Sequence, residues 1–377
     1  MRTNLLRSVV VMALGVVSAP GFAQAPAAPA APAGTAVVVR GLTDPWAMAF
    51  LPDGRMLITE KAGQLRIATA DGRLSAPLAG LPAVAATGQC GLLDVVLDPQ
   101  FSENRRLFFT FAEPGPGGNS TAVGSARLVD DQLREVRTLF SQKPKMDSGS
   151  HCGSRIVIDR QGHLLVGLGD RFSGKDEAQN PGNHLGKVVR LTTEGRAPAD
   201  NPFVGRAGAA PEVFSLGHRN IQGAALHPVT GELWASEHGP QGGDEINVVE
   251  AGRNYGWPLV TYGRNYGVGT RIGETGPKAG FEQPLHHWAP TSIAPSGMVF
   301  LSSDRYQARQ PDWKGSLFIG ALRGQALVRL TVDGRRVTAE QRLLEGQARI
   351  RDVRQGQDGW LYVLTDGANG QVLRLLP

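Results

Sequence analysis

Hydrophobic and polar positions along this chain repeat a short phrase. Beyond residue 35, apolar runs of about four to six residues alternate with turns rich in Gly, Asp, Asn and Pro, and helical spacing is nearly absent. This pattern is typical of an all-β protein. The phrase consists of an apolar run, a turn with Pro, Asp or Gly, and a second apolar run. It occurs at residues 47–60, 92–111, 155–170, 223–237, 297–321 and 351–366.

The six phrases read as six hairpin-like units within one domain over residues 35–377. A single small sheet cannot bury both of its faces, so such units pack on one another around a ring. Ring closure also leaves only short, protected edges. The sequence therefore predicts a six-bladed β-propeller. A pair of β-sandwiches is the structural alternative, but it does not account for six similar phrases. We expect the long segments between the phrases, such as 170–217 and 252–290, to carry loops on one face.

The first residues have the features of a targeting segment. Arg2 and Arg7 supply positive charge, residues 8–19 are apolar, and Ala23-Gln24-Ala25 fits a small-x-small cleavage site. We therefore expect a signal peptide over residues 1–25, export to the periplasm, and an Ala/Pro-rich linker over residues 26–34. The apolar stretch is short for a membrane span, so stable insertion is not expected and a retained anchor is the less favoured alternative.

The charge and the cysteine content of the chain limit its expected partners and its covalent structure. The 377-residue chain carries a formal charge of +5, but its Lys and Arg residues are spread along the sequence. No basic arm for nucleic acid is evident, so no nucleic-acid partner is expected. The two cysteines, Cys90 and Cys152, either form a disulfide in an oxidising compartment or remain as two buried thiols.

Polar residues occupy the same place in successive phrases, just before the first apolar run. In a propeller, equivalent positions converge at one end of the central channel, so we expect these side chains to form a binding pocket. They are Gln89 before the second phrase, His151 before the third, Arg219 and Asn220 before the fourth, and Arg349 and Arg351 at the start of the sixth.

The segment from Gly217 to Asn247 concentrates further polar chemistry. It contains a cation, an amide, a Gly-Pro turn and the two carboxylates of Asp244 and Glu245 within about thirty residues. Carboxylate and carbonyl oxygens are ligands that a hard cation prefers. The mixture indicates a site for a polyanionic cofactor together with such a cation.

The run GHRNIQGAALHPVTGELWASEHGPQGGDEINVVEAGRNYGWP, at residues 217–258, resembles the soluble quinoprotein sugar dehydrogenases. The similarity extends from residues 41–46 to Arg374 and is nearest to the aldose sugar dehydrogenase branch. This resemblance implies a six-bladed propeller that binds pyrroloquinoline quinone (PQQ) and Ca²⁺. It also implies an aldose substrate that is oxidised at C1 to the lactone, with electrons passed to an external acceptor.

The resemblance assigns roles to the pocket residues. His151 matches the general base that takes the proton of the anomeric hydroxyl, and a histidine suits this role because it titrates near neutral pH. Arg219 matches a residue that stabilises negative charge on the reduced quinone, and Asn220 contacts the quinone beside it. The other PQQ contacts implied by the resemblance are Gln89, Tyr266, Arg349 and Arg351.

The resemblance also implies two calcium sites. The carbonyls of Gly239 and Pro240 match ligands of an ion that touches PQQ, and Glu245 and the Tyr255 carbonyl match a second, structural site. Arg323 stands where the family often has a lysine that contacts PQQ, which changes the reach of that contact. Ser150 stands where the glucose-specific branch has an aspartate, so the preferred sugar is not carried over.

The cysteines directly follow two pocket positions, Gln89 and His151. If those side chains converge, the cysteines are also close, and we predict a Cys90–Cys152 disulfide. Two rival functions remain open. One is a calcium-dependent lactonase or esterase on a similar propeller, which would not need the Arg349 and Arg351 pair. The other is a propeller that binds a glycan or a protein without catalysis.

Overall fold

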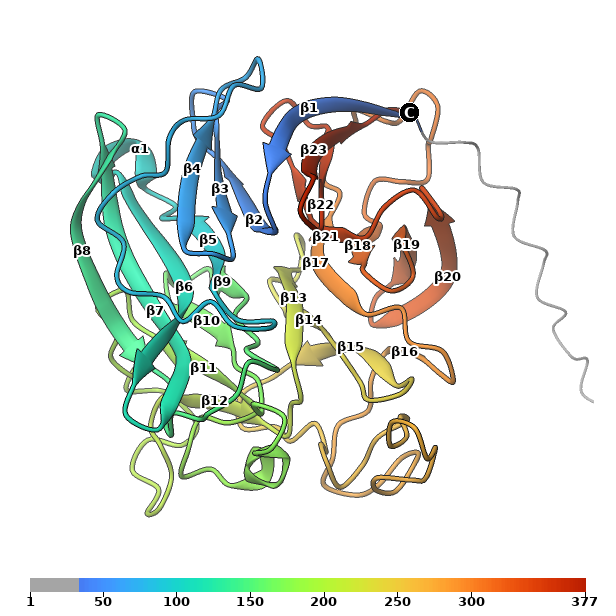
Figure 1. Cartoon of the computed structure of the whole chain (residues 1–377). Helices are drawn as coiled ribbons and strands as arrows, with labels where there is room; N and C mark the ends of the chain where they lie inside the picture. Colours follow the sequence, from blue (N-terminus) through green and yellow to red (C-terminus); the bar gives the residue numbers. More distant parts are fainter. Residues whose placement is uncertain (1–33) are drawn as a thin grey trace, which may run out of the picture.

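The computed structural model describes residues 34–377, which form six sheets (Figure 1). The signal peptide expected at residues 1–25, and the linker as far as residue 33, lie outside the described residues. Blade 1 consists of β2 (Pro45–Phe50), β3 (Met56–Glu60) and β4 (Gln64–Ala68). Blade 2 consists of β5 (Leu92–Leu97), β6 (Arg106–Gly115), β7 (Gly118–Val129) and β8 (Gln132–Ser141), with the short helix α1 (Phe101–Asn104) between β5 and β6.

The next two sheets contain most of the candidate chemistry. Blade 3 consists of β9 (Ile156–Ile158), β10 (Leu164–Gly167), β11 (Lys187–Leu191) and β12 (Val213–Leu216), with the 3₁₀ helix η1 (Lys175–Gln179) after β10. Blade 4 consists of β13 (Ile221–Leu226), β14 (Leu233–Glu237), β15 (Asp244–Val249) and β16 (His286–Trp288).

The last two sheets complete the ring. Blade 5 consists of β17 (Pro295–Phe300), β18 (Leu317–Ala321), β19 (Ala326–Asp333) and β20 (Arg336–Leu343). Blade 6 consists of β21 (Ile350–Gln355), β22 (Leu361–Thr365) and β23 (Gly370–Leu375), and its outermost strand is β1 (Thr35–Leu42) from the start of the described chain. The blue strand β1 thus lies beside the red strand β23 in Figure 1.

The six sequence phrases are the two inner strands of the six blades, so the propeller prediction is confirmed. The innermost strands contact one another in a closed cycle, β2–β5–β9–β13–β17–β21–β2. Every residue of β3, β10, β14, β18 and β22 is buried. The second strand of each blade packs between neighbouring blades, which explains why it is mostly apolar on both faces.

The long segments between the phrases contain both loops and strands. Residues 170–217 include the outer strands β11 and β12 of blade 3. Residues 252–290 are irregular except for the short strand β16. No helix within residues 34–377 is long and apolar enough to cross a membrane.

Candidate active site

His151 lies in the turn before β9, at the end of the ring where the innermost strands begin. Its backbone is left-handed, with φ of +47°, and its N–H donates to Gln89 Oε1 at 2.9 Å. The turn passes so close to the chain beyond β10 that a Cβ on Gly169 would lie 1.8 Å from the His151 carbonyl oxygen. Glycine at 169 is therefore required for His151 to occupy this position.

The His151 ring is oriented by a buried carboxylate. Nδ1 and Asp170 Oδ1 are 2.6 Å apart, so the carboxylate accepts from Nδ1–H and leaves Nε2 as the basic nitrogen. Asp170 is fully buried. Its Oδ1 also accepts from the Phe172 N–H at 2.8 Å, and its Oδ2 accepts from Trp257 Nε1 at 2.7 Å.

Burial lowers the pKa of His151, because the charged imidazolium is poorly solvated there. The hydrogen bond with Asp170 opposes this effect, and the positive charge of Arg219 adds to it. The net lowering keeps the ring neutral at neutral pH, which is the form that accepts a proton.

Arg219 lies across the channel end, just before β13. Its Nη1 donates to the carbonyls of His238 at 2.8 Å and Gly239 at 2.6 Å, and its guanidinium lies 5.3 Å from the Trp257 ring centroid. Arg219 Nε is buried and has no hydrogen-bond partner among the described residues. An unpartnered charged donor of this kind is costly unless an anionic group approaches it.

Asn220 is connected to the arginines of blade 6 through Gln222. Asn220 Oδ1 accepts from the Gly153 N–H at 3.0 Å and from Gln222 Nε2 at 3.2 Å. Gln222 Oε1 in turn accepts from Arg351 Nη1 at 3.2 Å. Residues from blades 3, 4 and 6 are therefore joined in one hydrogen-bond network.

Arg349 and Arg351 share one carboxylate, Asp366. Arg349 Nε and Arg351 Nη2 donate to it at 2.9 Å and 3.0 Å. The Arg349 side chain remains 48% exposed, so it has donors left for a ligand. Arg323 is exposed and directly follows Leu322, whose carbonyl accepts from Arg349 at 3.3 Å. The predicted pair and Arg323 thus lie on one side of the channel end.

Tyr266 is not brought into this group. It is 58% exposed on the long segment between β15 and β16, and none of the hydrogen bonds of the site involves it. Tyr262, the neighbouring tyrosine, stacks on His287 with the ring centroids 3.9 Å apart and donates to Gln283 at 2.9 Å.

Three of the four predicted calcium ligands line one small cavity, and Pro240 is not among its lining residues. It measures about 10 Å³, room for about one water-sized sphere, and Gly239, Glu245 and Tyr255 are among its lining residues. Burial raises the pKa of Glu245 well above its usual range, and the charge of Glu237 raises it further. The carboxylates of Glu237 and Glu245 both line this cavity, and carboxylate oxygens are ligands that a divalent ion such as Ca²⁺ prefers. Residues 34–377 contain no cluster of three His, Cys, Asp or Glu ligands, so such an ion would need backbone carbonyls as well.

Four residues important to this geometry were not predicted, namely Asp170, Glu237, Trp257 and Asp366. Three of them carried a signal, because an acidic residue ends the third, fourth and sixth phrases of the repeat. These acidic residues close the second strand of a blade, at the end where the next polar turn begins. Trp257 carried no such signal, since it lies in an irregular segment outside the repeat.

The predicted disulfide is confirmed. Cys90 and Cys152 are bonded, with their Cα atoms 5.8 Å apart. The bond joins the turns that hold Gln89 and His151, and therefore ties blade 2 to blade 3 beside the base. Arg171 Nη1 contacts both sulfur atoms.

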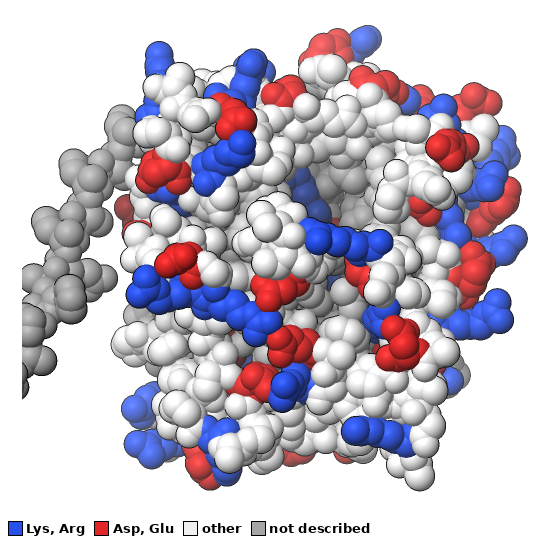
Figure 2. Space-filling view, turned by 180° about the vertical axis from the view of Figure 1, so that it is seen from behind, with Lys and Arg blue, Asp and Glu red and all other residues white. Residues whose placement is uncertain are grey.

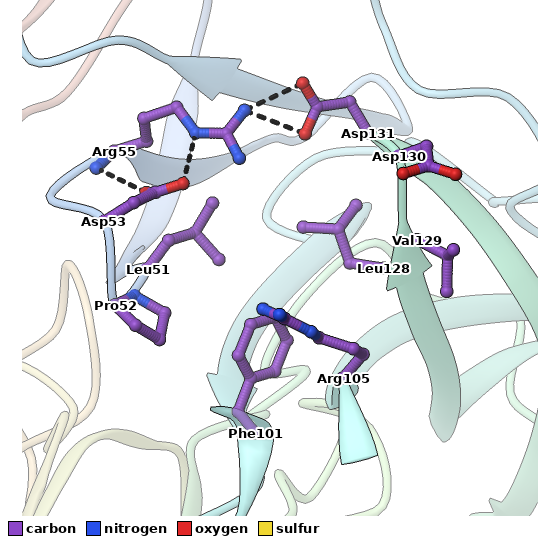
Figure 3. Close-up of a pocket in the computed structure, with 10 residues that line it drawn as sticks. All are labelled: Leu51, Pro52, Asp53, Arg55, Phe101, Arg105, Leu128, Val129, Asp130 and Asp131. Atoms are coloured by element: carbon purple, nitrogen blue, oxygen red, sulfur yellow. Dashed lines mark hydrogen bonds and ion pairs between the residues drawn. The ribbon is translucent and has the colours of Figure 1, made fainter. Parts of the chain in front are cut away.

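A larger cavity lies elsewhere. It measures about 360 Å³ and is lined by the β2–β3 turn, α1 and the β7–β8 turn, as Figure 3 shows. Arg55 bridges Asp53 and Asp131 across it at 2.8 and 2.7 Å. These turns follow the ends of β2, β5 and β7, so the cavity opens on the face opposite His151, and none of the predicted site residues lines it.

The hollow of the ring is visible from behind (Figure 2). Acidic and basic side chains alternate over this face without a continuous patch of one sign, and basic side chains lie within the hollow.

Comparison with known proteins decides the family. The profile of the Glucose / Sorbosone dehydrogenase family matches residues 42–374, which include every blade. The chain belongs to this family. The aldose sugar dehydrogenase YliI of Escherichia coli K12 is 48% identical over 343 residues, which cover 89% of this chain and 91% of that protein.

Solved structures of the Glucose / Sorbosone dehydrogenase family share the fold. The apo-form of the soluble aldose sugar dehydrogenase from Escherichia coli is 44% identical, with a TM-score of 0.86 over 92% of this chain and 99% of that one. The PQQ-bound aldose sugar dehydrogenase from Streptomyces coelicolor is 28% identical, with a TM-score of 0.75 over 93% of this chain and 99% of that one. The expected membership of the quinoprotein sugar dehydrogenases is therefore confirmed, and the chain is an oxidoreductase of that family.

Proposed function

We propose that this protein is a periplasmic, PQQ- and calcium-dependent aldose sugar dehydrogenase that oxidises the anomeric carbon to the lactone. The observation that carries the proposal is the buried His151–Asp170 pair, which faces Arg219 at the channel end. PQQ, when bound, supplies the electrophilic quinone that accepts a hydride from the sugar. Family membership and the PQQ-bound relative support this choice of cofactor.

The residues present fit PQQ, which carries carboxylates and quinone oxygens. Arg349 and Arg351 present guanidinium forks that suit carboxylates, and Arg219 has a buried nitrogen without a partner. Gln89 and Asn220 border the same space, and Arg323 lies beside Arg349. Tyr266, whose side chain is exposed, is the remaining residue proposed to contact PQQ.

The chain itself performs the proton chemistry. Neutral Nε2 of His151 takes the proton of the C1 hydroxyl, and Asp170 stabilises the imidazolium that forms. The positive charge of Arg219 favours negative charge that develops nearby. Gly239 O now accepts from Arg219, so a calcium ion at the Gly239 and Pro240 carbonyls would share or displace that hydrogen bond. Glu245, with the Tyr255 carbonyl, would hold the second ion.

Reconstitution tests this function. The purified protein is mixed with PQQ and Ca²⁺, and sugar-dependent reduction of an artificial dye is measured for a panel of aldoses, with PQQ alone, Ca²⁺ alone and EDTA as controls. We expect dye reduction only with both additions, and loss of it in EDTA. Bound PQQ without dye reduction by any aldose would reject the dehydrogenase. The lactonase alternative predicts lactone hydrolysis without PQQ, and a non-catalytic propeller predicts neither activity.

A further inference from the structure

Trp257 occupies a position that the proposed chemistry does not yet use. It lies in the irregular segment between β15 and β16 of blade 4 and is 7% exposed. Its indole Nε1 donates to Asp170 Oδ2 at 2.7 Å, and Asp170 Oδ1 binds His151 Nδ1 at 2.6 Å. A tryptophan, an aspartate and a histidine from blades 3 and 4 therefore form one buried line of hydrogen bonds.

The same indole ring contacts the second charged group of the site. The Arg219 guanidinium lies 5.3 Å from the ring centroid, within the range of a cation–π interaction. Trp257 is itself held by its backbone, because its N–H donates to Gly217 O at 3.0 Å and its carbonyl accepts from Gln179 Nε2 at 2.7 Å. The indole is thus fixed independently of the groups it touches.

We propose that Trp257 is a positioning residue for the general base, because its indole N–H binds Asp170 Oδ2 and so keeps Oδ1 directed at His151. This inference rests on the proposed function for its catalytic meaning. Within residues 34–377, Trp257 is the hydrogen-bond partner of Asp170 Oδ2, while Oδ1 is shared by His151 and the Phe172 N–H. Without the indole, Oδ2 loses this partner, and the carboxylate is held through its two hydrogen bonds at Oδ1 alone.

The indole N–H also moderates the negative charge that His151 meets. A donor to a carboxylate stabilises its anionic form, so the carboxylate attracts the proton of a neighbouring imidazolium less strongly. The other charged groups that act on His151 are Arg171, which follows Asp170, and Arg219, which precedes β13. His238, after β14, is neutral near pH 7 because burial and nearby arginines lower its pKa to about 3. Trp257 therefore helps to hold His151 in its neutral form.

Trp257→Phe tests the proposal, since phenylalanine keeps an aromatic side chain beside Arg219 and removes the indole N–H together with part of the ring. His151 is titrated by NMR in the apo-protein, and kcat/KM is measured against pH in the PQQ-loaded enzyme. We expect the pKa of His151 to rise by about half a unit or more, because the carboxylate that faces it loses a donor that stabilises its anionic form. The pH at which kcat/KM declines on the acid side should move upward with this pKa.

The chain offers a matched control. Trp288, which is 6% exposed, donates to Glu340 Oε2 at 2.8 Å, and His286 binds the same oxygen at 3.2 Å. Trp288→Phe therefore removes an equivalent indole–carboxylate hydrogen bond beside another histidine in blade 4. It should leave the His151 titration and the pH profile unchanged. A purely structural role for Trp257 would reduce activity equally at all pH values and leave the acid limb where it is.

The outcomes separate this proposal from the proposed function. A His151 pKa in folded Trp257→Phe within about 0.2 of the wild-type value would overturn the proposal. If that variant does not fold, the indole proton of Trp257 is followed in the wild-type protein, where it should shift with the same midpoint as His151; an unchanged resonance overturns the proposal. A shifted His151 in a protein that oxidises no aldose would support the pairing and reject the dehydrogenase.

Discussion

At the scale of single residues, the chemistry depends on where burial places charge. His151 is 5% exposed, and burial lowers its pKa below the usual value near 6.5. Its neutral form therefore persists above that lowered pKa and is lost as the pH falls through it. We expect kcat/KM to be flat at neutral pH and to decline only under acidic conditions, below the ordinary titration range of histidine. A decline centred above pH 7 would contradict this assignment.

Replacement of His151 tests the same base directly. His151→Ala removes the proton acceptor and should lower kcat/KM by about 10²–10⁴-fold, the usual contribution of general base catalysis. The PQQ affinity should change little, because His151 is not among the residues assigned to the cofactor carboxylates. His163→Ala, a partly exposed histidine beside Asp159, is the control and should retain full activity. Equal rates in the two variants would remove His151 from the mechanism.

Some residues of the site could be predicted from the sequence and others could not. Gln89, His151 and Arg219 precede the innermost strands, and Arg351 lies at the start of β21, so the repeat alone predicts that they come together. The partners that set their properties were harder to predict. Asp170 touches His151 only because the chain turns back after β10, and the burial that lowers the histidine pKa is a property of the closed ring.

At the scale of elements, the turns before β5 and β9 are joined by a covalent bond. Cys90 and Cys152 are 62 residues apart in sequence, and their disulfide ties blade 2 to blade 3 beside His151. A crosslink over a loop of this length stabilises a protein mainly by limiting its unfolded state, in the chain-entropy description. The sequence suggested the pair only through its adjacency to Gln89 and His151.

Removal of this bond should weaken the whole propeller. For Cys90→Ala/Cys152→Ala we expect the free energy of unfolding to fall by about 2–4 kcal/mol, measured by guanidinium denaturation. The matched experiment is the wild-type protein denatured with and without a reductant, which should reproduce the loss, while the double variant should not respond to the reductant. A wild-type midpoint that is the same with and without reductant would contradict a stabilising disulfide.

Some contacts of the site come from irregular segments, and the hydrophobic pattern of the sequence could not predict them. Trp257 lies in a segment without strand periodicity, yet its backbone is fixed by Gly217 and Gln179, and its indole reaches Asp170. Contacts of this kind join positions about 40 to 90 residues apart, and no local alternation of hydrophobic residues encodes them.

At the scale of the whole molecule, the site exists only while the ring is closed. Its residues come from blades 2 to 6, and no single blade holds both the base and the arginines. Closure is supported by direct packing of β2 on β21 and β22 and by β1, which pairs with β23 from Thr35–Leu375 to Leu42–Gly370. Val39 and Leu42 of β1 pack with Met48 of blade 1 and with Leu364 and Val372 of blade 6. The repeat predicted the ring but not that its first strand would complete its last blade.

Two substitutions in β1 test this closure. Val39 is 1% exposed and Val37 is 40% exposed, because a register shift between them turns the strand. Val39→Asp buries a carboxylate among apolar side chains and should cost about 3 kcal/mol or more, whereas Val37→Asp should cost about 0.5 kcal/mol or less. Thermal unfolding and retention of PQQ measure both. Because the ring holds the site together, Val39→Asp should lose stability and PQQ together, although β1 supplies no ligand; equal behaviour of the two variants would show that closure does not depend on β1.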